Sequence, residues 1–221
     1  MSAQRFADRR DAGRALGARL VEEKHDAAQT VVLGLPRGGV IVAAEVASAL
    51  GAPLDVLVVR KLGLPWQPEL AMGAIAAVGD VVETVRVAAV IDAAHVDEAV
   101  FDEVRRRELL ELRRREAAYR DGRPALAVTS RSVVIVDDGL ATGATMRAAV
   151  VAVRRQHPAH VTVAVPIGSP TALADLTAEA DAAVCLSAPH GFRAVGQGYD
   201  DFGETVDEEV RQALARSRTS A

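Results

Sequence analysis

The sequence is poor in the residues that covalent cross-links and metal clusters require. Cys185 is the single cysteine among 221 residues, which excludes a disulfide framework and a zinc or iron–sulfur site built from several cysteines. No apolar run approaches the roughly 20 residues that a membrane span needs, and the charged first residues do not resemble a secretory signal. We therefore expect a cytoplasmic protein with no membrane partner.

Aromatic residues and lysines are also scarce. Aromatic side chains make up 3% of the chain, and Lys24 and Lys61 are the two lysines among 26 basic residues. A lysine is therefore not part of the compositional background, and Lys61 stands out. The net charge of −4 gives no overall positive field for nucleic acid, so we expect no nucleic-acid partner.

Apolar residues, by contrast, make up 50% of the chain, which is ample for a core. Short β-branched runs alternate with helical patterns, and this alternation predicts the α/β class, with a mostly parallel, doubly wound sheet flanked by helices. Because no repeat or linker divides the chain, we expect a single domain over residues 1–221. The predicted strands are 30–33, 54–59, one or two within 73–82, 133–136, 161–165 and 182–186; the predicted helices are 3–24, 40–50, 95–120, 145–156, 169–179 and 205–217.

The strongest functional pattern follows one of the predicted strands. Residues 133–145 read V-V-I-V-D-D-G-L-A-T-G-A-T, so four apolar residues lead into two carboxylates, a glycine-containing turn and a helix. Successive backbone N–H groups and a helix N-terminus in such a turn bind phosphate, and Thr142 and Thr145 add hydroxyl donors. Adjacent acids would repel a phosphate, so Asp137 and Asp138 suit the hydroxyl groups of a ribose.

Other phosphate-binding motifs do not fit this segment. It has no Gly-Lys-Ser/Thr of a P-loop, and its glycines do not follow the G-x-G-x-x-G spacing. The alternative interpretation is a purely structural corner between strand and helix, with Asp138 as a helix cap and Gly139 in a left-handed turn.

The segment resembles the signature with which type I phosphoribosyltransferases bind phosphoribosyl pyrophosphate (PRPP). The resemblance implies that Asp137 and Asp138 are catalytic residues, which hold the ribose and lie near the positive charge that develops at C1, and that the loop after them holds the 5′-phosphate. The implied phosphate-binding residues are Gly139, Ala141, Thr142, Gly143, Ala144 and Thr145.

A second segment, Gly34-Leu35-Pro36-Arg37-Gly38-Gly39, is similar to the pyrophosphate loop of the same family. The N–H groups of Arg37, Gly38 and Gly39 can face an anion, and the guanidinium can hold a phosphate through two hydrogen bonds. The resemblance also implies a cis peptide bond between Pro36 and Arg37. The alternative is a glycine turn that lets a helix pack tightly on the strand.

Arg60 and Lys61 follow the next predicted strand, where the family has a basic residue that contacts pyrophosphate. The resemblance implies pyrophosphate contacts for both residues, a catalytic role for Lys61, and an irregular lid over residues 60–73. The segment departs from members with strong lid catalysis, because Glu69 is its single charged residue after Lys61. The alternative for Lys61 is a solvated strand end.

The C-terminal region, residues 187–221, resembles the hood of purine-specific members more weakly. This likeness implies that Phe192 stacks on the acceptor, that Val195 lies beside it, and that Asp200 faces the metal. The lysine with which those members recognise a purine has no counterpart, because no lysine follows residue 61. The alternative is a tail that packs Phe192 and Tyr199 onto the core.

Two arginine triplets, at 105–107 and 113–115, lie in the predicted long helix. We interpret them as self-paired rather than as an RNA-binding face, because Asp102, Glu103 and Glu111 stand four residues before arginines. The same helix offers a surface for a homodimer.

Together with the resemblance, these residues predict an enzyme that binds PRPP with Mg²⁺, joins a nitrogen nucleophile to ribose C1 and releases pyrophosphate. The metal is expected to be held mainly by PRPP and water. Two alternatives stay open: a regulator that senses PRPP or a nucleotide without turnover, and a phosphosugar-binding module with other chemistry. The identity of the acceptor is not determined.

Overall fold

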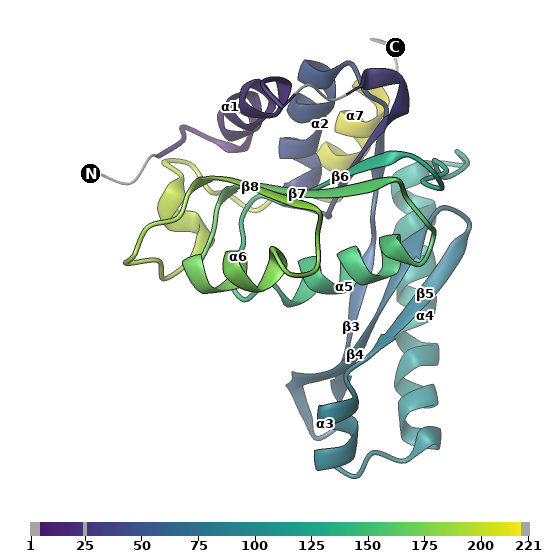
Figure 1. Cartoon of the computed structure of the whole chain (residues 1–221). Helices are drawn as coiled ribbons and strands as arrows, with labels where there is room; N and C mark the ends of the chain where they lie inside the picture. Colours follow the sequence, from purple (N-terminus) through teal and green to yellow (C-terminus); the bar gives the residue numbers. More distant parts are fainter. Residues whose placement is uncertain (1–4, 24–25, 218–221) are drawn as a thin grey trace.

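The centre of the fold is a parallel sheet of five strands in the order β2-β1-β6-β7-β8 (Figure 1). The computed structural model describes residues 5–23 and 26–217. β1 is buried along its whole length, because helices cover both faces of the sheet. The five strands are β1 (Thr30–Gly34), β2 (Leu54–Val56), β6 (Ser132–Val136), β7 (His160–Ile167) and β8 (Ala182–Ser187).

Helices lie on both faces of this sheet (Figure 1). Val32 and Val134 pack against the helices of one face, whereas the adjacent Val31 and Val133 pack against those of the other. The predicted doubly wound α/β architecture is therefore confirmed. One face carries α1 (Arg9–Val21) and α2 (Gly38–Leu50), with α7 (Asp207–Arg216) against α2, and the other carries α5 (Ala144–Arg154) and α6 (Pro170–Leu176).

The predicted element boundaries are most accurate where a residue with left-handed backbone ends a helix. α2 ends at Gly51, which has a φ of 63°, as the sequence predicted. The first helix is shorter than predicted, because the side chain of Asp8 accepts a hydrogen bond from the Asp11 N–H and caps α1 there. The predicted ends of that helix, at residues 3 and 24, lie outside the described residues. The predicted strand 54–59 is wrong in extent, since β2 ends at Val56.

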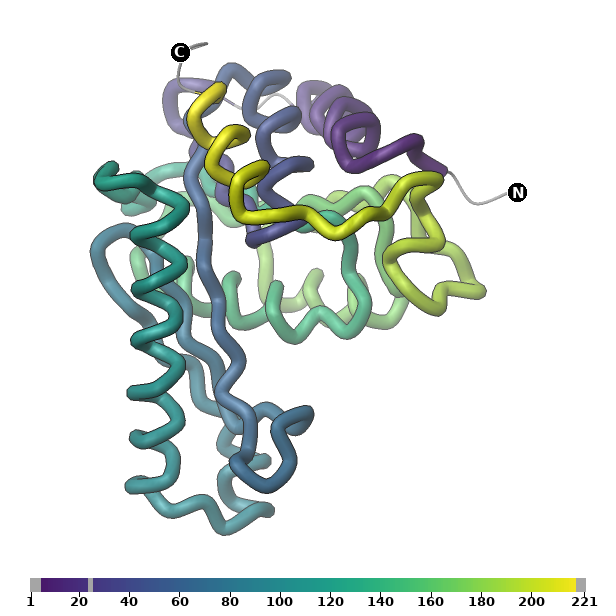
Figure 2. The backbone as a smooth tube through the Cα atoms, turned by 180° about the vertical axis from the view of Figure 1, so that it is seen from behind, coloured from purple at the N-terminus to yellow at the C-terminus, as the bar shows by residue number. Residues whose placement is uncertain are grey.

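Residues 59–120 form an arm; the sequence predicted its long helix and strands within 73–82, but not their assembly into a separate antiparallel unit. Figures 1 and 2 show the arm extending away from the parallel sheet, with its long helix running along its own strands. Leu62, Ile75 and Leu112 belong to its apolar core. The arm consists of an antiparallel sheet of β3 (Val59–Leu64), β4 (Gln67–Val78) and β5 (Val81–Arg86), followed by α3 (Ala88–Ala93) and α4 (Glu98–Arg120).

The irregular lid predicted for residues 60–73 is wrong in local structure, because most of it lies in the β3–β4 hairpin. Leu62 and Leu64 are buried and alternate with Lys61 and Gly63, which is the period of a strand. A Cβ at Gly63 would lie 2.4 Å from the carbonyl oxygen of Pro68, and the strand pairing shifts register beside this glycine. The glycine and proline content therefore marks an irregular hairpin rather than a loop.

The charges of α4 are paired within the helix, as predicted. Arg115 lies 2.7 Å from Glu111, as predicted. Arg106 and Arg107 instead pair with Glu103 and Glu108, rather than with the predicted Asp102 and Glu103. The arginine triplets are therefore largely neutralised in place. Within residues 5–23 and 26–217, no helix, α4 included, has both the length and the apolar character to cross a membrane.

Candidate functional site

The candidate site lies beyond the carboxyl ends of β1 and β6, which are neighbours in the parallel sheet. From β1 the chain passes through α2 and returns to the sheet as β2, on one side. From β6 it passes through α5 and returns as β7, on the other side. The connections therefore diverge, and such a point opens a crevice between the two loops. These loops are the patterns singled out from the sequence, residues 34–39 and 137–145.

The structure brings the two loops into direct contact at the pair of acids. A Cβ added to Gly38 would lie 1.9 Å from Oδ2 of Asp138, and one added to Gly39 would lie 2.7 Å from Oδ1 of Asp137. No side chain fits at either position without moving a carboxylate. Glycine is therefore required here for the close approach of the backbone to the acids.

The two acids form a coupled electrostatic unit, which we call the acid pair. Burial of the Asp137 carboxyl raises its pKa well above the usual value, and the negative charge of Asp138 raises it further. Two contacts oppose this shift: the Asp138 N–H donates to Oδ1 of Asp137 at 2.8 Å, and the positive charge of Arg9 lowers the pKa. The acid pair therefore retains a proton more readily than two free aspartates would.

Arg9, in the first turn of α1, completes this unit, and the sequence analysis missed it. Its Nε donates to Oδ2 of Asp138 at 2.7 Å, and the two side chains are only 14% and 17% exposed, so solvent screens the pair little. The guanidinium also donates to the carbonyl oxygen of Gly203 at 2.7 Å and lies 4.0 Å from the ring centre of Phe202. In the sequence, nothing distinguishes Arg9 from the adjacent Arg10.

The 139–145 loop presents a row of free backbone donors. Ala141, Thr142, Ala144 and Thr145 are exposed, and Gly143, with a φ of 77°, leads into the N-terminus of α5. Among the described residues, none accepts a hydrogen bond from the backbone N–H groups of residues 141–145. A turn of this kind at a helix N-terminus is suited to an anion.

The purely structural interpretation of this loop is wrong in two respects. Asp138 does not cap α5, whose N-cap is Gly143 and which has no side-chain cap; its carboxylate binds Arg9 instead. Gly139 does not have the left-handed backbone that this interpretation requires. It is needed for close packing, because a Cβ there would lie 2.3 Å from Cγ1 of Val195.

The 34–39 loop offers a second set of backbone donors. No described residue accepts from the N–H groups of Arg37, Gly38 and Gly39, and the peptide bond between Pro36 and Arg37 is cis, as the resemblance implied. The side chain of Arg37 is turned toward the C-terminal segment, where its Nη2 lies 2.5 Å from Glu204. Its guanidinium is therefore paired with a carboxylate in this conformation.

The two basic residues of β3 separate, because adjacent side chains of a strand point to opposite faces. Lys61 lines a cavity of about 350 Å³ between the arm and α5, together with Ala144 and Thr145. Arg60 points toward α4, where its Nε donates to Glu108 at 3.0 Å. The structure thus places Lys61 beside the 139–145 loop and commits Arg60 to an ion pair within the arm.

The residues after β8 approach the site mainly through Val195, which contacts Gly139. Phe192 is partly buried and packs against a small core of Phe6, Ile167 and Tyr199. This is the arrangement of the packed tail that we considered as the alternative to base stacking. The Tyr199 hydroxyl donates to the carbonyl oxygen of Asp138 at 2.5 Å, so this segment also braces the acid pair.

Asp200, the residue that the resemblance points toward a metal, is exposed and forms an ion pair with Arg5 at 2.8 Å. Within the ranges that the structure covers, no three side chains of His, Cys, Asp or Glu gather as metal ligands would. The structure therefore does not place Asp200 with the acid pair.

The fold and these two loops define a class of protein. The chain belongs to the phosphoribosyl transferase domain family, whose model matches residues 8–196. The resemblance inferred from the 34–39 and 137–145 loops is thus confirmed.

Individual relatives agree with this assignment. Over 214 residues the chain is 51% identical to a protein of Mycobacterium tuberculosis, found in two strains and named "Putative phosphoribosyl transferase". The alignment covers 96% of this chain and 47% of that protein, so the chain spans about half the length of the curated relatives it matches.

Among solved structures, the protein TT1426 of Thermus thermophilus is 46% identical with a TM-score of 0.85, over 96% of this chain and 99% of that one. A purine phosphoribosyltransferase of Pyrococcus horikoshii is 19% identical with a TM-score of 0.43, over 83% and 87% of the two chains, a likeness too low to indicate an acceptor.

Proposed function

We propose that the protein is a phosphoribosyltransferase that binds Mg-PRPP and transfers the phosphoribosyl group to a nitrogen nucleophile, with release of pyrophosphate. The observation that carries this proposal is the acid pair enclosed between two loops of unpaired backbone donors. PRPP carries a 5′-phosphate at one end of its ribose and a pyrophosphate at the other, with the ribose hydroxyls between them. The site offers backbone donors for the two phosphate groups, and carboxylate acceptors for the hydroxyls between them.

The 139–145 loop is assigned to the 5′-phosphate. The free N–H groups of residues 141–145 and the N-terminus of α5 stabilise a dianion, and the exposed hydroxyl groups of Thr142 and Thr145 can donate as well. The acid pair is assigned to the ribose hydroxyls, because carboxylates accept hydrogen bonds from them and would repel either phosphate group.

The 34–39 loop and Lys61 are assigned to the pyrophosphate. As the bond between C1 and pyrophosphate breaks, its electron pair leaves with the pyrophosphate, and the nucleophile forms a new bond to C1. The N–H groups of Arg37, Gly38 and Gly39 and the charge of Lys61 favour this separation by stabilising the leaving group. Arg37 would exchange its exposed partner Glu204 for the pyrophosphate.

Magnesium fits this site as a part of the substrate complex. Mg²⁺ keeps several waters and binds through substrate phosphates with one or two carboxylates. The described residues provide no dedicated cluster of three ligands, which suits a metal that PRPP itself carries. When bound, Mg²⁺ would neutralise charge on the pyrophosphate, and this chain's contribution is to orient the phosphates with its backbone donors.

A titration with Mg-PRPP tests the ligand assignment. We expect saturable, Mg-dependent binding by the wild type and none by the Asp137→Asn, Asp138→Asn double variant, which loses both charged acceptors while keeping their shape. Asp175→Asn, at an exposed aspartate of α6, is the matched control and should bind as the wild type does. Wild-type affinity in the double variant would contradict the assignment.

A second candidate function, a sensor of PRPP without turnover, is favoured by two observations. Lys61 is directed to Glu69 at 3.4 Å, and the partly buried Phe192 packs against a small core of Phe6, Ile167 and Tyr199. Exchange of labelled pyrophosphate into PRPP in the presence of a base separates the two functions, because a sensor would bind PRPP and catalyse no exchange.

The acceptor can be sought with a thermal-shift screen of nucleobases and their monophosphates, with PRPP and Mg²⁺ present. A ligand at about 100 times its Kd stabilises the native state by about 2.7 kcal/mol, which such a screen detects. If no base raises Tm beyond PRPP alone, the sensor becomes the better description.

A further inference from the structure

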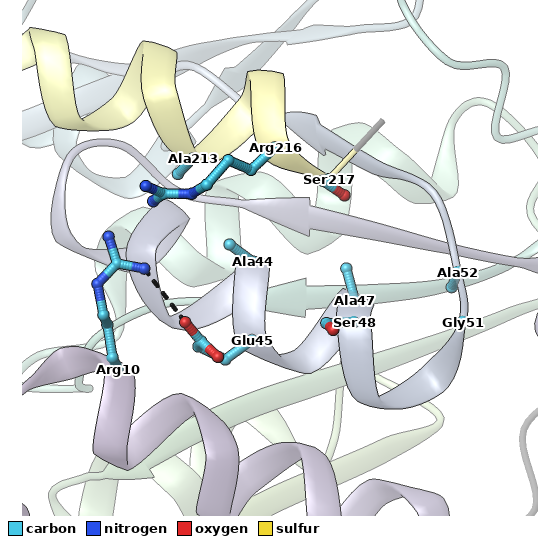
Figure 3. A pocket seen from close by; sticks show the side chains of 10 residues that line it. All are labelled: Arg10, Ala44, Glu45, Ala47, Ser48, Gly51, Ala52, Ala213, Arg216 and Ser217. Atoms are coloured by element: carbon cyan, nitrogen blue, oxygen red, sulfur yellow. Dashed lines mark hydrogen bonds and ion pairs between the residues drawn. The ribbon is translucent and has the colours of Figure 1, made fainter. Parts of the chain in front are cut away.

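Two adjacent arginines at the start of α1 have different partners. Arg10 lies 3.2 Å from Glu45 of α2, beside a hollow of about 190 Å³ that also receives Arg216 (Figure 3). Arg9 instead reaches the acid pair and binds Asp138. Arg10 therefore fastens α1 to α2, whereas Arg9 connects α1 to the candidate site.

Arg9 is held in place by the C-terminal segment from the other side. Phe202 stacks under its guanidinium at 4.0 Å, and the carbonyl oxygen of Gly203 accepts from Nη1 at 2.7 Å. A planar group with contacts to a ring, a carbonyl and a carboxylate has little freedom to rotate. Arg9 thus presents Nε to Asp138 in a fixed direction.

The backbone around Asp138 is fixed by the same two segments that hold Arg9, residues 6–9 and residues 199–203. Tyr199 donates to the carbonyl oxygen of Asp138, and Tyr199 pairs with Phe6 through a parallel bridge, as the adjacent course of the two segments in Figure 2 indicates. Both the backbone and the carboxylate of Asp138 are therefore positioned by residues far away in the sequence.

We propose that Arg9 is a positioning residue for PRPP: it holds the Asp138 carboxylate in the one orientation in which its other oxygen can accept a hydrogen bond from a ribose hydroxyl. This inference rests on the proposed function. A carboxylate has about four acceptor positions on its two oxygens, so the bond from Arg9 to Oδ2 leaves Oδ1 for the sugar. Arg9 itself does not touch the sugar.

The charge of Arg9 has a consequence that can be measured apart from packing. The Asp137 carboxyl is faced by Asp138, which raises its pKa, and by Arg9, which lowers it. Without Arg9, the acid pair should retain its proton to higher pH, and a protonated acid is a poorer acceptor for the ribose hydroxyls. A variant without the charge should therefore need a higher pH than the wild type to reach its full affinity for PRPP.

The experiment measures Mg-PRPP affinity by calorimetry from about pH 6 to pH 9 for the wild type, Arg9→Gln, Arg9→Lys and Arg10→Gln, with the Tm of each. Hydrogen bonds to charged groups contribute about 1.5–3 kcal/mol, so Arg9→Gln should weaken binding about 10- to 100-fold and shift the pH profile upward. Arg9→Lys should restore the profile and part of the affinity. Arg10→Gln loses an ion pair of the same helix and should bind as the wild type does.

The outcomes separate this inference from the proposed function. Wild-type affinity and pH profile in Arg9→Gln, with PRPP bound normally by the wild type, would overturn the inference alone. Equal losses of affinity in Arg9→Gln and Arg10→Gln, in proportion to losses in Tm and with no change of pH profile, would also overturn it, because Arg9 would then act only through the packing of α1. Failure of the wild type to bind Mg-PRPP would overturn the proposed function, and this inference with it.

Discussion

Replacing Gly139 with alanine should force the 139–145 loop away from the segment that covers it. The added Cβ would lie 2.3 Å from Cγ1, 2.8 Å from Cγ2 and 3.0 Å from Cβ of Val195. All three distances are shorter than a carbon–carbon contact, which is optimal at about 3.5–4.0 Å. Val195 is β-branched and has few rotamers with which to yield, so the two backbones must separate.

The size of the effect follows from overpacking. Adding a methyl group to a filled site typically costs about 1–3 kcal/mol, and about 1 kcal/mol changes the Tm of a domain of this size by about 2–4 °C. We therefore expect Gly139→Ala to lower Tm by about 2–12 °C and to weaken Mg-PRPP binding, because residues 141–145 belong to the same loop.

A double-mutant cycle isolates the contact. Val195→Ala removes Cγ1 and Cγ2, the two atoms that the new methyl group meets most closely. The Gly139→Ala, Val195→Ala variant should therefore be more stable than the two single changes predict, by about 1–2 kcal/mol. Gly191→Ala is the control, since a Cβ there has no atom within 4 Å, and its Tm should stay close to that of the wild type. Additive effects of Gly139→Ala and Val195→Ala in thermal unfolding would refute the reasoning.

Two further predictions concern titrating groups. The native pKa of Asp137 is raised above its usual 3.8, so wild-type stability should fall as the pH rises from about 4 through the native pKa. Asp137→Asn should therefore have a higher Tm than the wild type at about pH 8, and this difference in Tm should vanish near pH 4. An equal difference in Tm at the two pH values would contradict this prediction. Burial raises the pKa of Cys185 from 9.0 to about 11. At about pH 8 the reaction of Cys185 with a disulfide reagent should therefore be about a hundredfold slower in the native protein than in urea-unfolded protein. Equal reaction rates would show that the Cys185 thiol is not buried.

The sequence was informative where function depends on the order of residues along one strand and its loop. The acids at 137–138 and the glycines at 38–39 follow two buried strands, and parallel strands bring their carboxyl ends to one edge of the sheet. A small number of local patterns therefore predicted both loops and the protein family, which the family comparison confirms, whereas the ligand stays a prediction.

The sequence was uninformative where function depends on partners far apart in the chain. Arg9 is 129 residues from Asp138, and no local pattern distinguishes it from the other arginines of α1. The different surroundings of Arg60 and Lys61 could be predicted only once β3 was known to include both residues. Side chains alternate along a strand, so the Arg60 side chain faces α4 and the Lys61 side chain faces the cavity beside α5. The glycine and proline content that suggested a lid arises from a hairpin, which the same composition equally permits.

The most direct test of the central claim is a crystal structure of the protein with Mg-PRPP bound. The account predicts that the 5′-phosphate accepts hydrogen bonds from the N–H groups of residues 141–145, with the ribose hydroxyls donating to Asp137 and Asp138. A bound PRPP that leaves those N–H groups without an acceptor, or that turns a phosphate rather than its ribose toward the two aspartates, would contradict it.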